Sequence, residues 1–412
     1  MAANSRASRA RGDPDFILIL SVAGLIVAGL MMVYSATFDW SYQEYDSSLH
    51  IALRQFRWVG VGVVALVVFT VIPYRWWEKI AVPVMGVTLL SLLLVLFLGE
   101  DVFGARRSFL GGSVHPGELA KLSMVIYIAV WLSSKGDQVR DVTYGLIPFA
   151  VLLGVVTGLI VAQPDLGTAA LIGLTSLAVF FFAGADIFQL AVAGAVSAVT
   201  FFFLITKFPH AMERITDWLE VWRSPELAGH HMQQTLIALG SGGPFGVGLG
   251  QGQQKLGYLP TPHTDSIFAV LGEEMGLLGC LFVVALFVLF AFRGFKITMD
   301  AQDPFAALLA SGITCWITLQ ALINVGVVTA LLPFTGMALP FISCGGSSMV
   351  SSLAGVGVLL SVSRGKRTTE RTSKQTGNWE VSRQYATMDR RWGNRGTRVS
   401  RSRGRSGASR RG

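Results

Sequence analysis

Charged side chains are scarce in this sequence. Asp, Glu, Lys and Arg together make up 14% of its 412 residues, whereas an ordinary soluble domain has about 25%. Apolar side chains make up 52%. So little charge beside so much apolar surface excludes a typical soluble domain. It predicts an all-α, polytopic membrane protein.

Cysteine is also rare. The three cysteines, Cys280, Cys315 and Cys344, all lie within or beside apolar runs. Their number and spacing give neither a disulfide framework nor a metal site, so we interpret them as small buried apolar side chains. A cleavable signal peptide is not expected either, because the first apolar run is too long and no small-residue cleavage pattern follows it.

Long apolar runs occupy most of the chain. About 17–25 apolar residues are enough to cross a bilayer as a helix. We identify ten runs, at approximately 16–37, 52–72, 80–98, 118–134, 145–162, 166–183, 187–205, 266–292, 305–331 and 341–363. They predict a membrane domain of about ten transmembrane helices at 16–363, with one long loop at 206–265 and tails at 1–15 and 364–412.

The tails predict the orientation. An even number of spans puts both termini on one side, and residues 364–412 carry 15 Lys and Arg residues. The positive-inside rule makes that side cytoplasmic and the 206–265 loop extracytoplasmic. The C-terminal tail is rich in Ser, Gly and Arg, so we expect it to be disordered. We expect it to attract anionic lipid headgroups rather than nucleic acid.

Some basic residues fall on the predicted outer side, against the positive-inside rule. There are nine of them: Arg54, Arg57, Arg106, Arg107, Lys121, Lys207, Arg214, Arg223 and Lys255. An anionic ligand on that side, such as a phosphate or diphosphate, would explain the set. The alternative is that they pair with nearby acids, as Glu118 would with Lys121 three residues later.

Two short connections carry more polar chemistry than a turn requires. In the first, Pro116 lies near a helix start and Glu118 falls in the first turn, where the helix dipole favours an acid. Lys121, one turn deeper, is not explained by capping. In the second, Gln163-Pro-Asp-Leu-Gly-Thr168, Asp165 is placed either to cap the sixth helix or to serve a site.

The long segment 206–265 has two recognisable parts. Ile215, Trp218, Leu219 and Trp222 follow the spacing of an amphipathic helix, which we interpret as anchored in the membrane interface. Further on, eight of the 18 residues from 240 to 257 are glycine. A phosphate-binding P-loop is excluded because no Gly-Lys-Ser/Thr follows and no strand precedes it. The glycines instead indicate close approach of the backbone to a substrate or a helix, or a loop that moves.

Asp265 ends this segment, at the mouth of the eighth apolar run. It would either cap the helix that follows or act as a general base at the membrane surface, where partial desolvation raises the pKa of a carboxyl group. His263 lies two residues earlier. Glu273 and Glu274 fall inside the run, where a charge costs about 2.5–3.5 kcal/mol, so they should face the interior of the bundle.

Several motifs occur in a fixed order along this helix pattern. They are Tyr34-Ser-Ala, Gly104-Ala-Arg-Arg, Pro116-Gly-Glu-Leu-Ala-Lys121, Gln163-Pro-Asp-Leu-Gly-Thr168, Ser241-Gly-Gly, Gly246-Val-Gly-Leu-Gly250, His263-Thr-Asp265, Gly272-Glu-Glu274, Asn324-Val-Gly and a run from Leu332 to Ser348. Together they resemble the SEDS family (shape, elongation, division and sporulation), represented by FtsW and RodA. The resemblance covers residues 13–363. One departure is Leu259-Pro-Thr261, where the family usually has Leu-Pro-Glu.

The resemblance implies a function and a set of site residues. Proteins of this family polymerise lipid II into glycan strands in the bacterial cytoplasmic (inner) membrane. It implies that Asp265 is the catalytic carboxylate, with substrate-site roles for Glu118, Lys121, Asp165 and Ser343. We add six substrate-binding candidates from the same motifs and loops: Arg106, Arg107, Gln163, Lys255, His263 and Glu273.

The resemblance also implies partners. These are lipid II and the nascent glycan strand, a class B penicillin-binding protein, membrane lipids and other division or elongation proteins, but no nucleic acid. The charged tails favour an FtsW-like division protein. No cofactor is required on this interpretation, and a divalent cation (Mg²⁺ or Mn²⁺) would assist the diphosphate, although no ligand spacing is diagnostic.

Two other function classes fit part of the pattern. A flippase or transporter for lipid-linked sugars would also use intramembrane charges and interrupted helices, but the sequence shows no clear repeat of two halves. A non-catalytic scaffold for a transpeptidase would explain the apolar bulk and not the cluster of outer acids and bases. The Asp265→Asn variant separates these hypotheses, because only catalysis requires the carboxylate.

Overall fold

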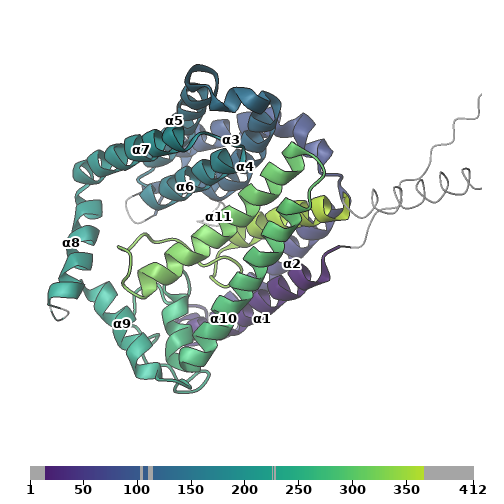
Figure 1. Ribbon diagram of the computed structural model, residues 1–412. Helices are drawn as coiled ribbons and strands as arrows, with labels where there is room; N and C mark the ends of the chain where they lie inside the picture. Colours follow the sequence, from purple (N-terminus) through teal and green to yellow (C-terminus); the bar gives the residue numbers. More distant parts are fainter. Residues whose placement is uncertain (1–13, 103–104, 110–114, 225, 227–228, 366–412) are drawn as a thin grey trace, which may run out of the picture.

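The computed structural model describes residues 14–102, 105–109, 115–224, 226 and 229–365. The two predicted tails therefore lie almost wholly outside the described residues. Helices make up most of the described chain (Figure 1), which confirms the all-α class. Two short strands, β1 (Glu100–Val102) and β2 (Ala105–Ser108), form an antiparallel pair in the connection before the fourth helix.

The helices follow the predicted apolar runs. They are α1 (Phe16–Tyr45), α2 (His50–Val71), α3 (Arg75–Leu98), α4 (Pro116–Lys135), α5 (Ile147–Val161), α6 (Leu166–Phe182), α7 (Ile187–Lys207), α8 (Pro209–Arg223), α9 (His230–Gly242), α10 (Ile267–Met299), α11 (Pro304–Val328) and a last helix, Gly346–Gly365. Short 3₁₀ and π turns at Gly136–Arg140 and Val142–Leu146 join α4 to α5.

Nine helices of the described chain are long and apolar enough to cross a membrane. The helix α6 is apolar but shorter, because Asp165 caps its start and Gly184, at φ +85°, follows its end. These ten helices match the ten predicted runs, and the protein is a multi-pass membrane protein.

The core lies around α11, which packs against α4, α6 and α10 (Figure 1). About 72% of the apolar stretch of α11 is buried inside the protein, against 6% for α7. The one buried side chain of α7 is Gln189, whose amide donates to the carbonyl of Arg140 at 2.7 Å. The rest of the described chain therefore leaves nearly all of the apolar surface of α7 uncovered.

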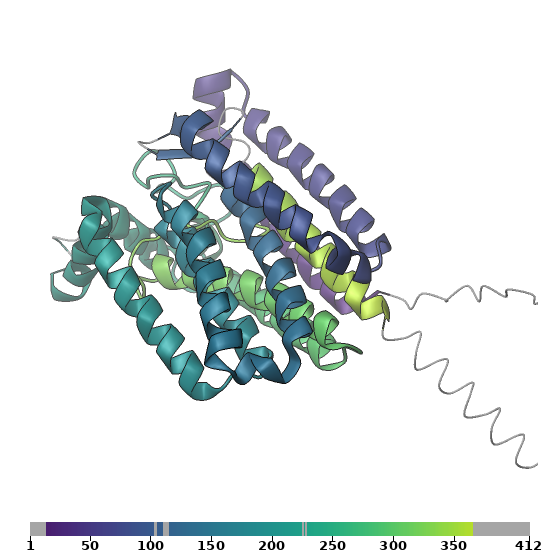
Figure 2. The same ribbon diagram turned by 90° about the horizontal axis from the view of Figure 1, so that it is seen from above.

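The described chain begins and ends at the same end of the bundle, which we call the terminal end. There Asp15 pairs with Arg293, Tyr74 donates to Asp303 at 2.6 Å, and the carbonyl of Gly365 accepts from the Gln302 amide. Figure 2 shows the first and last helices reaching this end side by side. The opposite end, which carries Asp265, is called the loop end.

The segment predicted as a long loop contains two helices, α8 and α9. Helix α8 confirms the amphipathic pattern around residues 215–222. Its two tryptophans also bind protein: the indole N–H groups of Trp218 and Trp222 donate to the carbonyl of Ala330, at 2.9 and 3.3 Å. Ala330 has a positive φ of 59° just beyond α11. The tryptophans thus tie α8 to the end of α11.

The glycine-rich part packs against a break in α10. Gly276 interrupts that helix with φ 66° and ψ −166°. The N–H groups of Val247 and Gly248 donate to the carbonyls of Glu273 and Glu274, at 3.0 and 3.1 Å. A Cβ atom on Gly246 would lie 2.2 Å from the Glu274 carbonyl oxygen. The predicted close approach of this backbone to a neighbouring helix is confirmed.

This contact predicts that Gly246→Ala lowers the stability of the fold more than Gly250→Ala does. Gly246 and Gly250 have nearly equal φ values, +82° and +81°, but a Cβ atom on Gly250 would meet nothing within 4 Å. Gly250→Ala should cost only the left-handed strain of about 1–2 kcal/mol. Gly246→Ala adds a backbone clash and should lower the thermal unfolding midpoint further. Equal midpoints for the two variants would contradict the close packing.

Candidate active site

Asp265 lies half-buried in the connection between α9 and α10. The N-cap of α10 is Ser266, which makes no capping hydrogen bond, so the structure excludes the helix cap, one of the two roles considered for Asp265. Its Oδ1 accepts hydrogen bonds from the hydroxyls of Thr261 and Thr264, at 2.6 and 3.0 Å. No donor among the described residues reaches Oδ2 within hydrogen-bond distance, and a Cβ atom on Gly336 would lie 3.8 Å from it.

The backbone around Asp265 is fixed by the segment that follows α11. The Asn324 side-chain amide donates to the carbonyls of both Asp265 and Met337, at 2.9 and 2.7 Å. The N–H of Cys344 donates to the His263 carbonyl at 2.8 Å. The carboxylate of Asp265 is therefore held by the hydroxyls of two threonines, and its backbone carbonyl by the buried side chain of Asn324.

Two imidazoles flank the carboxylate. His263 stacks on Trp40, with ring centroids 4.9 Å apart. His231 lies 4.2 Å from the Phe334 ring, and its Nε2 is 3.1 Å from the Ser266 hydroxyl. Burial lowers the pKa of both imidazoles, and the negative charge of Asp265 opposes that effect. Both rings are therefore neutral at neutral pH.

These two pKa shifts predict a loss of stability in acid. As the pH falls, the unfolded chain, whose His pKa is near 6.5, binds protons before the folded protein does. The free energy of unfolding should be undiminished above about pH 6.5 and fall as the pH drops through that value towards the lowered folded-state pKa. Unfolding midpoints measured across this range should decline less in His231→Gln/His263→Gln. An unchanged decline would contradict the prediction.

Lys121 lies at the centre of a second polar cluster. Its ammonium is 2.7 Å from Glu118 Oε2 and 3.0 Å from Gln320 Oε1, and it lies 5.7 Å from the centre of the Trp316 ring. The predicted pairing of Glu118 with Lys121 is confirmed. Only 3% of the Lys121 side chain is exposed, so the pair is strongly desolvated and its partners are needed to hold the charge.

One segment, residues 335–338, joins the two clusters. The Gln320 amide donates to the Ala338 carbonyl at 2.8 Å. Asn324 lies one turn further along α11, and its amide donates to the carbonyls of both Met337 and Asp265. Asp165 lies on the Lys121 side: it accepts from the Thr168 N–H at 3.0 Å, which confirms the predicted cap. A Cβ atom on Gly117 would lie 3.9 Å from its Oδ2.

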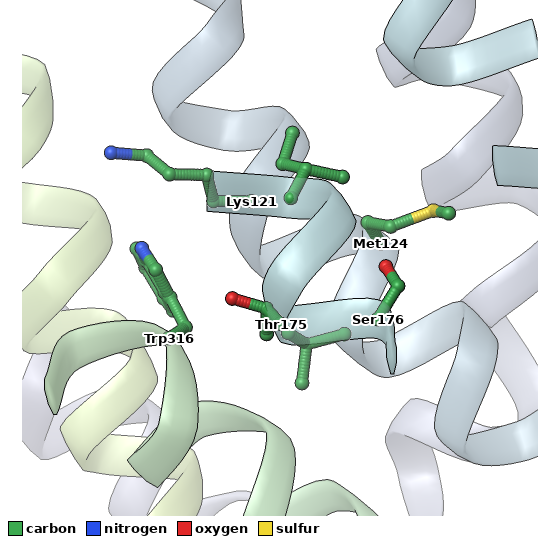
Figure 3. Close-up of a pocket in the computed structure, with 7 residues that line it drawn as sticks. Lys121, Met124, Thr175, Ser176 and Trp316 are labelled. Carbon is green, nitrogen blue, oxygen red and sulfur yellow. The ribbon is translucent and has the colours of Figure 1, made fainter. Parts of the chain in front are cut away.

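A small cavity lies below Lys121 (Figure 3). It is lined by Lys121, Met124, Val125, Ile172, Thr175, Ser176 and Trp316, and has a volume of about 10 Å³. The Thr175 hydroxyl, buried there, has no hydrogen-bond partner among the described residues. This space suits about one water molecule and is too small for a sugar substrate.

Other predicted substrate-binding residues use their polar atoms within the protein. The Gln163 amide donates to the Leu92 carbonyl at 3.0 Å. The Ser343 hydroxyl accepts from the Leu339 N–H at 2.7 Å. Arg106 and Arg107 lie on β2, and their side chains fall outside the described part of the chain. Their roles in binding substrate stay predictions.

Lys255, Glu273 and Glu274 form a buried network on the break in α10. The Lys255 ammonium is 2.6 Å from Glu274 Oε1, and the Ser35 hydroxyl lies 2.6 and 2.7 Å from the two oxygens of that carboxylate. Glu273 Oε1 accepts from the N–H groups of Gln253 and Gln254, at 2.8 and 3.3 Å. Both acids face the interior, as predicted. Together they clamp the loop that leads to Asp265.

Sequence reasoning assigned no site role to four residues, Ser35, Thr261, Gln320 and Asn324, although Ser35 and Asn324 lie in the motifs that carry the resemblance. Gln320 and Asn324 are polar residues four apart in an apolar run, so they share one helix face, and that spacing was a usable signal. Thr261 carried a signal in its departure from the usual glutamate. Ser35 belongs to the motif Tyr34-Ser-Ala, but its contact with Glu274 becomes visible only in the structure.

The comparisons with known proteins agree along the whole membrane domain. Residues 16–368 match the cell cycle protein family of FtsW, RodA and SpoVE. The chain is 39% identical over 362 residues to stage V sporulation protein E of Bacillus subtilis (strain 168), covering 86% of this chain and 98% of that protein. It is 37% identical over 353 residues to a probable peptidoglycan glycosyltransferase FtsW of Geobacter metallireducens, covering 85% and 94%.

Solved structures have the same fold. A chain of a peptidoglycan synthase complex that coordinates polymerization and crosslinking matches with a TM-score of 0.72 and 28% identity, over 86% of this chain and 98% of that one. The rod shape determining protein RodA of Thermus thermophilus matches with a TM-score of 0.64 and 29% identity, over 86% and 97%. On its sequence and its fold, this chain belongs to the FtsW/RodA/SpoVE family of multi-pass membrane proteins, the SEDS family.

Proposed function

We propose that this protein is a peptidoglycan glycosyltransferase that polymerises lipid II into glycan strands, with Asp265 as its general base. The observation that carries the proposal is the state of the Asp265 carboxylate. One oxygen is fixed by two hydroxyl donors. The other accepts no hydrogen bond from the described residues and lies 3.8 Å from where a Cβ atom on Gly336 would stand. Asp265 also caps no helix, because the N-cap of α10 is Ser266.

The proposed reaction is a displacement at a sugar carbon. The hydroxyl oxygen of the acceptor sugar forms a bond to the anomeric carbon of the lipid-linked donor, and the bond from that carbon to the diphosphate oxygen breaks. Asp265 takes the hydroxyl proton, and undecaprenyl diphosphate leaves with the bonding electron pair. Because the attacking group is a sugar hydroxyl, no second carboxylate is needed to activate water.

Basic groups would stabilise the diphosphate as it leaves. Lys121 is the first candidate. Gln320 and Asn324 on one face of α11 link its cluster to that of Asp265, which supports this role. Glu118 pairs with this lysine in its buried position. Arg106 and Arg107 remain proposed contacts from the preceding strand.

A divalent cation, Mg²⁺ or Mn²⁺, is part of the proposal only as an aid to the diphosphate. No three His, Cys, Asp or Glu side chains of the described residues come together to hold a metal ion. Mg²⁺ commonly takes one or two carboxylates together with substrate phosphates. Such an ion would therefore bind with the substrate rather than before it.

We further propose that the terminal end faces the cytoplasm and the loop end faces outward, in the bacterial cytoplasmic membrane. The basic residues of the tails support this orientation. It places Asp265 on the side where glycan strands grow. The likeness to a chain of a peptidoglycan synthase complex that coordinates polymerization and crosslinking supports a class B penicillin-binding protein as partner, in division or elongation.

The test uses the purified protein in liposomes that contain fluorescent lipid II, with and without a transpeptidase partner. We expect glycan strands, seen as a ladder of products on a gel. Movement of labelled lipid II between leaflets without strands would favour a flippase. Neither activity, from protein that unfolds cooperatively and binds the partner, would favour a scaffold.

A further inference from the structure

The loop after α9 exposes apolar side chains in an unusual place. Phe245 is 78% exposed, Val247 45%, Leu249 54% and Leu256 52%; we call these four side chains the apolar tip. From Gly243 to Gln254 the chain has no charged residue. The one nearby charge, Lys255, is buried against Glu274. A group of exposed apolar side chains without charge is typical of a contact surface.

Two contacts between α1 and α10, an ion pair and a hydrogen-bonded pair at opposite levels of the bundle, give its membrane thickness. Asp15 and Arg293 pair at the terminal end, and Ser35 and Glu274 bond on the same two helices towards the loop end. About 20 helical residues separate the two levels on each helix, and at 1.5 Å per residue this is about 30 Å. That distance equals the thickness of the hydrocarbon core of a bilayer.

The exposed side chains of α1 also indicate that the hydrocarbon core ends near the level of the Ser35–Glu274 contact. They are aliphatic at Leu20, Val27 and Met31, and become aromatic at Tyr34, Phe38 and Trp40. Aromatic side chains are enriched where hydrocarbon meets the headgroups. On α10, residues 267–274 are all buried, and exposed apolar side chains begin at Leu277.

The apolar tip lies at this boundary. The N–H groups of Leu277 and Leu278 donate to the carbonyls of Gly243 and Pro244, at 2.9 and 3.2 Å. Val247 donates to the Glu273 carbonyl, directly beside the Ser35–Glu274 level. Figure 1 shows α9 descending beside the first part of α10, with the connecting loop at the lower edge of the molecule.

We propose that the apolar tip inserts into the lipid leaflet at the loop end, where the acyl chains meet the headgroups. The buried Lys255–Glu274 pair then connects a membrane anchor to the loop that carries Asp265. Asp265 is nine residues from Glu274, so this anchor holds the carboxylate roughly 13 Å above the hydrocarbon boundary. This proposal concerns the membrane contact and does not depend on the proposed activity.

Spin labelling of the full chain in phosphatidylethanolamine–phosphatidylglycerol vesicles tests the contact. A nitroxide at Phe245→Cys is compared with one at Tyr258→Cys. Tyr258 is also exposed, at 59%. Its carbonyl lies 3.1 Å from the His230 ring, near the height of Asp265 in the bundle. Power saturation measures the access of O₂, which partitions into lipid, and of a nickel complex, which stays in water. Labelled wild-type protein gives the background from Cys280, Cys315 and Cys344.

We expect the label at residue 245 to be relaxed more by O₂ and the label at residue 258 more by nickel. Greater access of nickel at residue 245 would overturn the proposal and place the tip in water. Little access of either reagent would overturn it too, because protein would then cover the tip. A label at Leu249→Cys repeats the test if Phe245→Cys does not fold.

Discussion

Replacing Asp265 with asparagine should lower the rate of glycan polymerisation by at least about 100-fold, because general-base catalysis contributes about 10²–10⁴-fold. The amide keeps the volume of the side chain and can still accept from Thr261 and Thr264. It cannot take a proton from the acceptor hydroxyl. Initial rates of strand formation from lipid II, measured at equal amounts of folded protein, check this result.

A matched control separates chemistry from folding. Asp186→Asn changes an aspartate that caps α7 by accepting from the Phe188 N–H at 2.8 Å, and asparagine caps helices equally well. Its polymerisation rate should equal that of the wild type. A similar loss of rate in both variants would show that the assay reports damage to the fold and not loss of a base.

Of the substitutions considered, Lys255→Met should lower the free energy of unfolding most. The Glu274 carboxylate is fully buried, and without Lys255 it would keep the Ser35 hydroxyl as its one remaining hydrogen-bond donor. Removing one partner of a buried pair costs about 3–5 kcal/mol, because a buried charge is left without compensation. The thermal unfolding midpoint in detergent should fall clearly, and the loop that leads to Asp265 should loosen.

The double variant Lys255→Met/Glu274→Gln identifies the cause. It removes both charges, so it should be more stable than Lys255→Met alone. Lys296→Met is the control. It removes an exposed lysine at the far end of α10, the helix that carries Glu274, and should change the free energy of unfolding by less than about 0.5 kcal/mol. Additive losses in the double variant would contradict a direct pair.

The sequence predicted the membrane architecture well, because apolar run length alone decides whether a helix spans a bilayer. The ten runs correspond to ten apolar helices, and Asp165 caps α6 as its position indicated. The sequence could not distinguish a cap from a catalytic role at Asp265. Both roles put an aspartate just before a helix, and the structure excludes the cap because the N-cap of α10 is Ser266.

Contacts between side chains far apart in the sequence could not be predicted. Lys255 and Glu273 were predicted to bind substrate, but their polar atoms contact Glu274 and the backbone of the loop. Ser35 lies 239 residues from its partner Glu274. No periodicity links residues so far apart, since their contact depends on how α1 packs against α10. The tryptophans of α8 show the same limit, because their acceptor is a carbonyl in another segment.

The most direct test of the central claim measures binding and turnover on one sample of Asp265→Asn. If Asp265 is the base, this variant binds lipid II with the Kd of the wild type and forms glycan strands at least about 100-fold more slowly. Strands formed by the variant at the wild-type rate would contradict the account. Loss of lipid II binding would contradict it as well, since Asp265 would then hold the substrate and not activate the acceptor.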